Sequence, residues 1–158
     1  MRRRYLLVLP ATLSIGLVSC TASPEPDWEA AQAQADAFTT AASAGAGYLG
    51  GGWRAEQNEE VHGELHEEQG VTLDYASEVR IDGISVACFG DGEAGFGVMV
   101  RTESLWTGLD PITLACNSEP HTVPLAAPLE RINGIRLNGF FEGGPGAVIT
   151  AAVTGASE

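Results

Sequence analysis

Residues 84–101 read ISVACFGDGEAGFGVMVR, and their pattern points to the fold class. Apolar residues occupy every second position at 84–88 and again at 96–100, on either side of a glycine-rich centre. A period of two is typical of β-strands that bury one face. The central residues 90–95, GDGEAG, have the composition of a tight turn. The stretch therefore predicts two antiparallel strands joined by a hairpin.

The same alternation recurs further along the chain, at Ile112–Cys116 and Ile149–Val153. Clusters of turn-forming residues separate these runs, at 107–111, 133–134 and 143–146. Short strands at this spacing predict a mainly β protein, an antiparallel β-sandwich over residues 53–158. A jelly-roll-like and an immunoglobulin-like topology fit the pattern equally well.

Cys88 and Cys116 are expected to form a disulfide. Each cysteine continues the apolar face of its strand, so both thiols should point into the same core. The alternative is a pair of free buried thiols. A catalytic or metal role is disfavoured, because there is no Cys-x-x-Cys spacing and no histidine beside either residue.

One short N-terminal helix is expected before the sandwich, over residues 28–42, where alanine and glutamine abound and Gly and Pro are absent. The apolar residues of this segment share one narrow stripe of the helix: Trp28, Ala31, Ala35, Phe38 and Ala42. Two interpretations stay open, a helix that docks on the main domain and a partly frayed spacer. Residues 45–52 are rich in glycine and predict a linker.

The amino terminus has the three parts of a bacterial export signal. Arg2–Arg4 form a cationic segment, and residues 5–18 are uncharged and mostly apolar but too short to span a bilayer. Leu17-Val18-Ser19-Cys20 then resembles the lipobox of bacterial lipoproteins. The resemblance implies that residues 1–19 are a removable signal peptide and that Cys20 carries the lipid, including palmitate-like acyl chains. Residues 20–52 would then be a lipidated tether, and the protein would be anchored to the cell membrane on its extracytoplasmic side. The alternative is an ordinary secretory signal with a coincidental cysteine.

The charge balance restricts the partners. The chain has 21 acidic and eight basic residues, all eight of them arginine, for a formal net charge of −13. Because Arg2–Arg4 precede Cys20 and every acid follows it, the mature chain has five arginines against 21 acids and a net charge of −16. Repulsion between like charges argues against nucleic acid as a partner.

The densest polar cluster is the segment 59–68, EEVHGELHEE. Its alternation would place His62, Glu64 and His66 on one face, where two imidazoles and a carboxylate can bind a transition metal. The alternative is a solvated strand face in an acidic protein, and the spacing matches no specific metal motif. No metal or other cofactor is therefore expected.

Trp106 is a candidate for ligand binding. It is predicted to lie in a loop before Asp110-Pro111, either as a stacking surface for a sugar ring or as a lid over the edge of the sandwich. The chain has no Gly-x-Ser-x-Gly, no His-Glu-x-x-His and no phosphate-binding loop, so no catalytic residue is predicted.

The ACFGDG run and the second cysteine before Pro120-His121 make the body similar to small surface lipoproteins of actinobacteria. That resemblance implies no catalytic residue. The expected function is a non-enzymatic, membrane-anchored binding module, a monomer whose partner is a cell-wall glycan, a small solute or another exported protein. The alternatives are a metal-capture lipoprotein using His62, Glu64 and His66, and a small cell-envelope hydrolase with a dispersed site.

Overall fold

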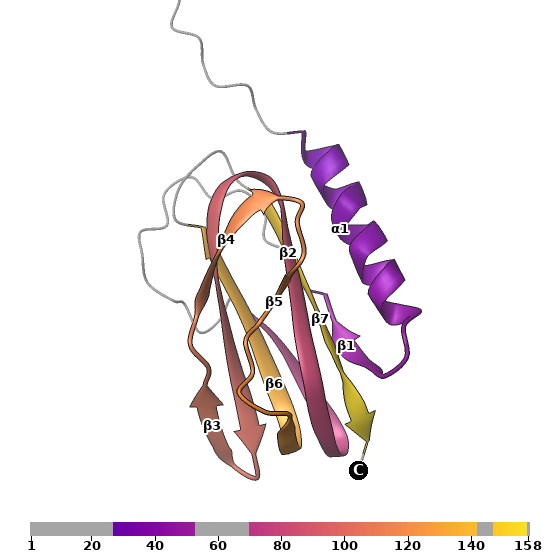
Figure 1. Ribbon diagram of the computed structural model, residues 1–158, viewed down its shortest axis with the longest axis vertical. Coiled ribbons are helices and arrows are strands. Elements are labelled where there is room, and N and C mark those ends of the chain that lie inside the picture. The colour runs from indigo at the N-terminus through magenta and orange to yellow at the C-terminus, as the bar shows by residue number, and fades with distance from the viewer. Residues whose placement is uncertain (1–26, 53–69, 142–146, 158) are drawn as a thin grey trace, which may run out of the picture.

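The computed structural model describes residues 27–52, 70–141 and 147–157 of this chain, which form one helix and seven strands (Figure 1). The helix is α1 (Trp28–Ser43). The strands are β1 (Tyr48–Gly51), β2 (Val71–Thr102), β3 (Leu105–Gly108), β4 (Ile112–Asn117), β5 (His121–Thr122), β6 (Leu129–Phe141) and β7 (Ala147–Ser157). The prediction of a mainly β fold preceded by one short helix is confirmed.

All seven strands belong to a single antiparallel sheet built around β2. The main path through the sheet is β1-β7-β2-β3, and β4, β5 and β6 each pair with β2 as well. The long β2 strand pairs with β7 through its middle part and with β6 through both of its ends: Leu137 of β6 lies opposite both Val71 and Val98. The β6 strand therefore runs between the two ends of β2. The structure does not show the strands divided into the two separate sheets of the predicted β-sandwich.

The predicted hairpin at residues 90–95 is wrong, because β2 continues through this segment. Phe89 pairs with Asn117 and Phe96 with Ile112, so β4 runs antiparallel to both sides of the glycine-rich centre. The register shifts between Phe89 and Glu93, where β2 has more residues than β4. Positive φ angles at Gly90 (129°) and Gly92 (94°) allow this bulge. β2 bends over the end of the molecule (Figure 1).

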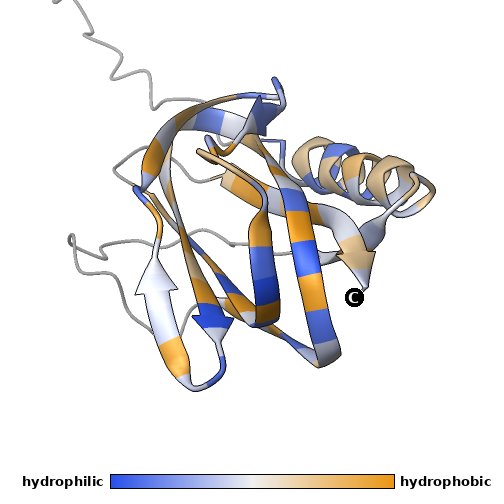
Figure 2. Cartoon of the chain, turned by 60° about the horizontal axis from the view of Figure 1, so that its bottom comes forward, coloured by the Kyte–Doolittle hydropathy of each residue, from blue (hydrophilic) through white to orange (hydrophobic). Residues whose placement is uncertain are grey.

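The predicted alternation is confirmed on the inner face of the sheet. Ile84, Val86 and Cys88 are fully buried. In the segment 96–100 of β2, every second residue is buried, namely Phe96, Val98 and Val100. Figure 2 shows hydrophobic and hydrophilic residues alternating along the strands. The predicted disulfide is also confirmed: Cys88 and Cys116 are bonded within the core, with their Cα atoms 4.4 Å apart.

The helix docks on the outer face of the sheet, which settles the two interpretations of residues 28–42. Ala31 and Ala35 are buried against Ala87, Phe89 and Val148 in a second apolar cluster. Trp28 and Phe38 pack at its border, with the Phe38 and Phe89 rings edge to face at 6.5 Å. The Asp27 carboxylate caps α1 by accepting a hydrogen bond from the Ala30 amide at 3.0 Å.

One polar contact crosses this helix–sheet interface. Thr150 of β7 is only 2% exposed, and its Oγ1 lies 2.9 Å from Thr39 Oγ1. The Thr39 hydroxyl donates its one hydrogen to Ala35 O at 3.0 Å, so Thr150 is the donor between the two threonines. Residues 147–153 of β7 are buried on both faces because α1 covers the outer one.

Part of the predicted linker is a strand. β1 lies within residues 45–52 and pairs with β7, with Gly51 opposite Ala152. A Cβ atom at Gly51 would collide with the Ala151 carbonyl oxygen, so glycine permits this close pairing. Glycine content here reflects close strand contact rather than a break in structure.

Candidate functional site

Several predicted site residues lie outside the described part of the chain, namely Cys20, His62, Glu64 and His66. Within residues 27–52, 70–141 and 147–157, no three His, Cys, Asp or Glu side chains gather in a group suited to a metal ion. None of these described residues forms a helix of the length and apolar character needed to cross a bilayer. Trp106 is the predicted ligand-binding residue that the structure places.

Trp106 lies on a strand and not in the predicted loop. It belongs to β3, which forms a hairpin with the end of β2, and it is paired directly with Arg101. Its ring is half-buried and contacts two cations: the guanidinium carbon of Arg101 lies 5.1 Å from the ring centroid, and that of Arg136 lies 5.0 Å away. These distances are within the range of cation–π attraction. We call Trp106, Arg101, Arg136, Asp74 and Thr72 the arginine–tryptophan surface.

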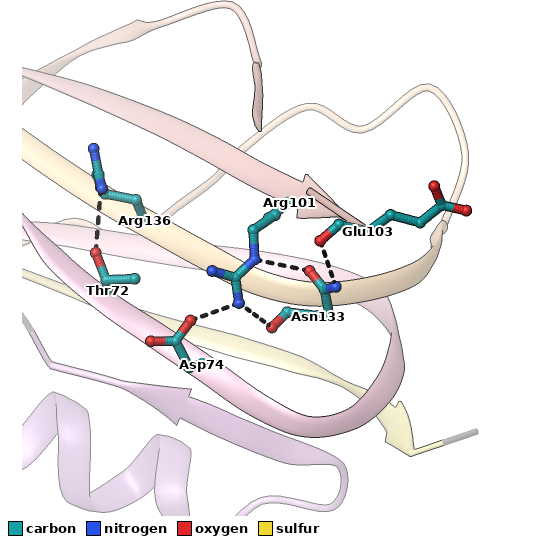
Figure 3. Close-up of polar contacts among 6 residues, drawn as sticks. All are labelled: Thr72, Asp74, Arg101, Glu103, Asn133 and Arg136. Carbon is teal, nitrogen blue, oxygen red and sulfur yellow. Dashed lines mark hydrogen bonds and ion pairs between the residues drawn. The ribbon is translucent and has the colours of Figure 1, made fainter. Parts of the chain in front are cut away.

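Arg101 is held in place by hydrogen bonds on several sides (Figure 3). Its Nη2 donates to Asp74 Oδ1 at 2.6 Å and to the Asn133 carbonyl oxygen at 3.0 Å, while Nε donates to Asn133 Oδ1 at 2.9 Å. Asn133 is itself fixed, because its Nδ2 donates to the Glu103 carbonyl oxygen at 2.8 Å. The charge of Arg101 is thus locally compensated by Asp74.

Gly134 explains how Arg101 reaches Asp74 across an intervening strand. In the sheet register, Gly134 of β6 lies opposite Asp74 on one side and Arg101 on the other. A Cβ atom at Gly134 would approach the Arg101 guanidinium to 3.0–3.1 Å. Because Gly134 has no side chain, the Arg101 side chain can cross β6 and reach Asp74. The prediction of a turn at residues 133–134 is therefore wrong, and the glycine serves side-chain packing within β6.

The Arg136 guanidinium makes fewer hydrogen bonds to the described residues than that of Arg101. Its Nε donates to Thr72 Oγ1 at 3.2 Å, and its guanidinium carbon lies 5.0 Å from the centroid of the Trp106 ring. No described carboxylate forms a salt bridge with it. Asp74, by contrast, keeps 66% of its side chain exposed, and among the described residues it accepts a hydrogen bond through one oxygen only. The surface thus presents a cation and a carboxylate oxygen, both open to further hydrogen bonds.

The sequence reasoning singled out Trp106 but missed Arg101 and Arg136. Both arginines occupy outward-facing strand positions: Arg136 lies between the buried Ile135 and Leu137, and Arg101 follows the buried Val100. The scarcity of arginine was the available signal, because only five arginines follow Cys20 in a chain of net charge −13. Their convergence requires the pairing of β2 with β3 and β6, and sequence periodicity does not specify that pairing.

Three buried polar atoms make no hydrogen bond within the described residues: Tyr75 Oη, His121 Nε2 and Asn138 Oδ1. They come from three different strands, β2, β5 and β6. Burial, followed by the nearby Tyr48, raises the pKa of Tyr75 from 10.0 to about 12. Tyr75 therefore stays neutral in the physiological range.

Compared with known proteins, the chain matches no protein-family model, no curated protein and no solved structure.

Proposed function

We propose that this protein is a lipid-anchored, extracytoplasmic binding lipoprotein without enzymatic activity. Its lipid would be attached at Cys20, and its ligand would bind to the arginine–tryptophan surface. The observation that carries the binding part of this proposal is the pair of arginines at Trp106, in a mature chain that is otherwise strongly acidic.

The disulfide supports the location. Structural disulfides persist in exported proteins and are rare in the reducing cytosol. The Cys88–Cys116 bond lies in the core, so it belongs to the folded domain and not to a peripheral loop. Together with the Leu17-Val18-Ser19-Cys20 motif, this favours export followed by lipid attachment.

The docked helix supports an anchored domain that stays close to the membrane. Only residues 21–27 separate Cys20 from α1, and seven extended residues span at most about 25 Å. Figure 1 places β3 at the end of the molecule opposite the start of α1. An anchor before α1 would therefore leave the arginine–tryptophan surface facing away from the membrane.

For the fold, we propose that the two ends of β2 lie with β6 in one layer of a sandwich and its middle lies with β7 in the other. Strands that change layers through a bulge or bend are known at the corners of such folds. The bulge after Phe89 is a suitable corner.

The location is tested by the Cys20→Ala variant of the full chain, expressed from its own signal. The parent protein should begin at Cys20 and carry acyl mass, and it should fractionate with the membrane. The variant should carry no lipid and leave the membrane fraction or remain unprocessed. Parent protein that starts elsewhere, or that has no acyl mass, contradicts the proposed anchor.

A further inference from the structure

We propose that Arg136 binds the carboxylate of a sugar acid that carries a single negative charge, while Asp74 and Thr72 receive the sugar hydroxyls. This inference rests on the proposed function and specifies the ligand class of the same surface. The chemistry follows from which hydrogen-bonding groups of the surface are already used and which are open.

The carboxylate is assigned to Arg136 because that cation is positioned but not neutralised. Thr72 occupies its Nε, and the Trp106 ring lies 5.0 Å from its guanidinium carbon. Both Nη nitrogens are without a hydrogen bond to the described residues, and a planar guanidinium presents paired N–H groups that fit a carboxylate. Arg101 is unsuited to the same role because Asp74 already neutralises it.

The neighbours of Arg136 select a hydroxylated ligand over a bare anion. The second oxygen of Asp74 makes no hydrogen bond within the described residues and is an acceptor for ligand hydroxyls. Thr72 Oγ1 accepts from Arg136 and keeps its own hydrogen for donation. Acetate would satisfy Arg136 alone, whereas a sugar acid offers a carboxylate and several hydroxyls on one ring.

The net charge restricts the ligand to one negative charge. The mature chain carries −16, and its long-range repulsion of an anion grows with the charge of that anion. A single charge can be outweighed by direct hydrogen bonds to Arg136, while a polyanion accumulates repulsion from acids within the Debye length, about 8–10 Å. Polyuronates and nucleotides are therefore expected to bind more weakly than a monosaccharide acid.

The test is a titration of the ¹⁵N-labelled full chain in detergent micelles, followed through the Arg136 Nε–H and Trp106 Nε1–H signals. The probes are glucuronate, glucose and acetate. We expect saturable shifts with glucuronate at a Kd of about 1 mM or tighter, and at least tenfold weaker binding of glucose and acetate. A neutral trisaccharide that ends in glucuronate distinguishes a glycan terminus from a free sugar acid as the source of the ligand. Whichever of the two binds more tightly identifies that source, and tight binding of either one supports the proposal.

Two variants separate a direct contact from a general charge effect. Arg136→Gln should weaken glucuronate binding at least about tenfold, because hydrogen bonds to charged groups are lost. Arg131→Gln removes the same charge from the same strand, at an exposed residue without a contact to Trp106, and should change the Kd less than twofold. Where Arg136→Gln fails to fold, Arg136→Lys serves instead and should also weaken binding, because the paired N–H groups are lost.

Three results would overturn the inference: no saturation by glucuronate or by the trisaccharide, equal binding of glucose, or glucuronate binding that Arg136→Gln leaves intact. None of these bears on lipid attachment, which is read separately from the acyl mass at Cys20. Equal binding of glucose would still leave a sugar-binding lipoprotein, so the inference and the proposed function can fail independently.

Discussion

Breaking the Cys88–Cys116 bond should destabilise the domain strongly without changing its fold. Both sulfurs lie in the core, where Cys88 is fully buried and Cys116 is 5% exposed. The bond connects positions that are 28 residues apart in the sequence, one in the middle of β2 and one in β4. Reduction keeps every atom of the side chains and removes only the cross-link, so it isolates the effect of the closed loop.

The magnitude follows from the length of that loop. In the chain-entropy treatment, closing about 28 residues in the unfolded state stabilises the native state by about 3.5 kcal/mol at 25 °C. With an unfolding entropy of about 2.1 cal/mol/K per residue, that loss should lower Tm by about 12–15 °C. The Cys88→Ala/Cys116→Ala variant also loses sulfur packing and should be less stable than the reduced parent by about a further 1–2 kcal/mol.

The assay is urea unfolding of the Cys20→Ala chain in two forms. One form is oxidised, and the other is reduced in urea and then refolded under reducing conditions. Thiol titration before reduction should find no free cysteine. The unfolding midpoint should fall on reduction while the circular dichroism of the folded state stays that of a β protein. A loss smaller than about 1 kcal/mol would refute the loop-closure reasoning, and two titratable thiols in the native protein would refute the bond.

Three further predictions concern the helix interface and the half-buried Tyr75. Ala35→Glu buries an unpaired charge under α1 and should lower the free energy of unfolding by at least about 3 kcal/mol. It should also expose the α1 amides to hydrogen exchange, whereas Ala37→Glu, on the exposed side of the helix, should change neither quantity. Thr150→Val removes the donor to Thr39 and should cost about 1 kcal/mol in urea unfolding; a cost within error of zero would mean that the hydroxyl pair adds nothing to stability. Because the pKa of Tyr75 is raised to about 12 in the folded state, its contribution to stability is complete below pH 10 and is lost as the pH rises towards 12. Tyr75→Phe should therefore flatten the fall in stability over this pH window, and a slope unchanged from the parent would contradict the raised pKa.

The local pattern of this sequence predicts which residues face the core. The alternation at 84–88, 96–100 and 112–116 identifies the side chains that face the inner core, because strand side chains alternate between faces whatever the neighbouring strand is. It does not predict the burial of Ala87, which lies on the outer face against α1. The same phase brings Cys88 and Cys116 onto one interior face, and their bond follows. The helix also follows from local signals, with Asp27 at its N-cap and no Gly or Pro within it.

Glycine-rich segments are harder to interpret from local composition, because a glycine has several structural uses. At residues 90–95 the glycines bend a continuous strand, at Gly51 they permit close pairing, and at Gly134 the missing side chain leaves room for Arg101. Each of these uses depends on a partner strand that is distant in the sequence. Local composition predicts a turn or linker in all three cases and cannot distinguish them.

The buried face of the strands, the cysteine pair and the helical segment all follow from the amino-acid sequence by itself, because each depends on periodicity within a few residues. The docking of α1 and the meeting of Arg101 and Arg136 at Trp106 do not. Both depend on which strands become neighbours: β7 with the middle of β2 under the helix, and β3 and β6 with the end of β2 beneath the arginines. That choice is a balance of long-range burial and hydrogen bonding over the whole sheet, so the candidate site emerges only when the chain has folded.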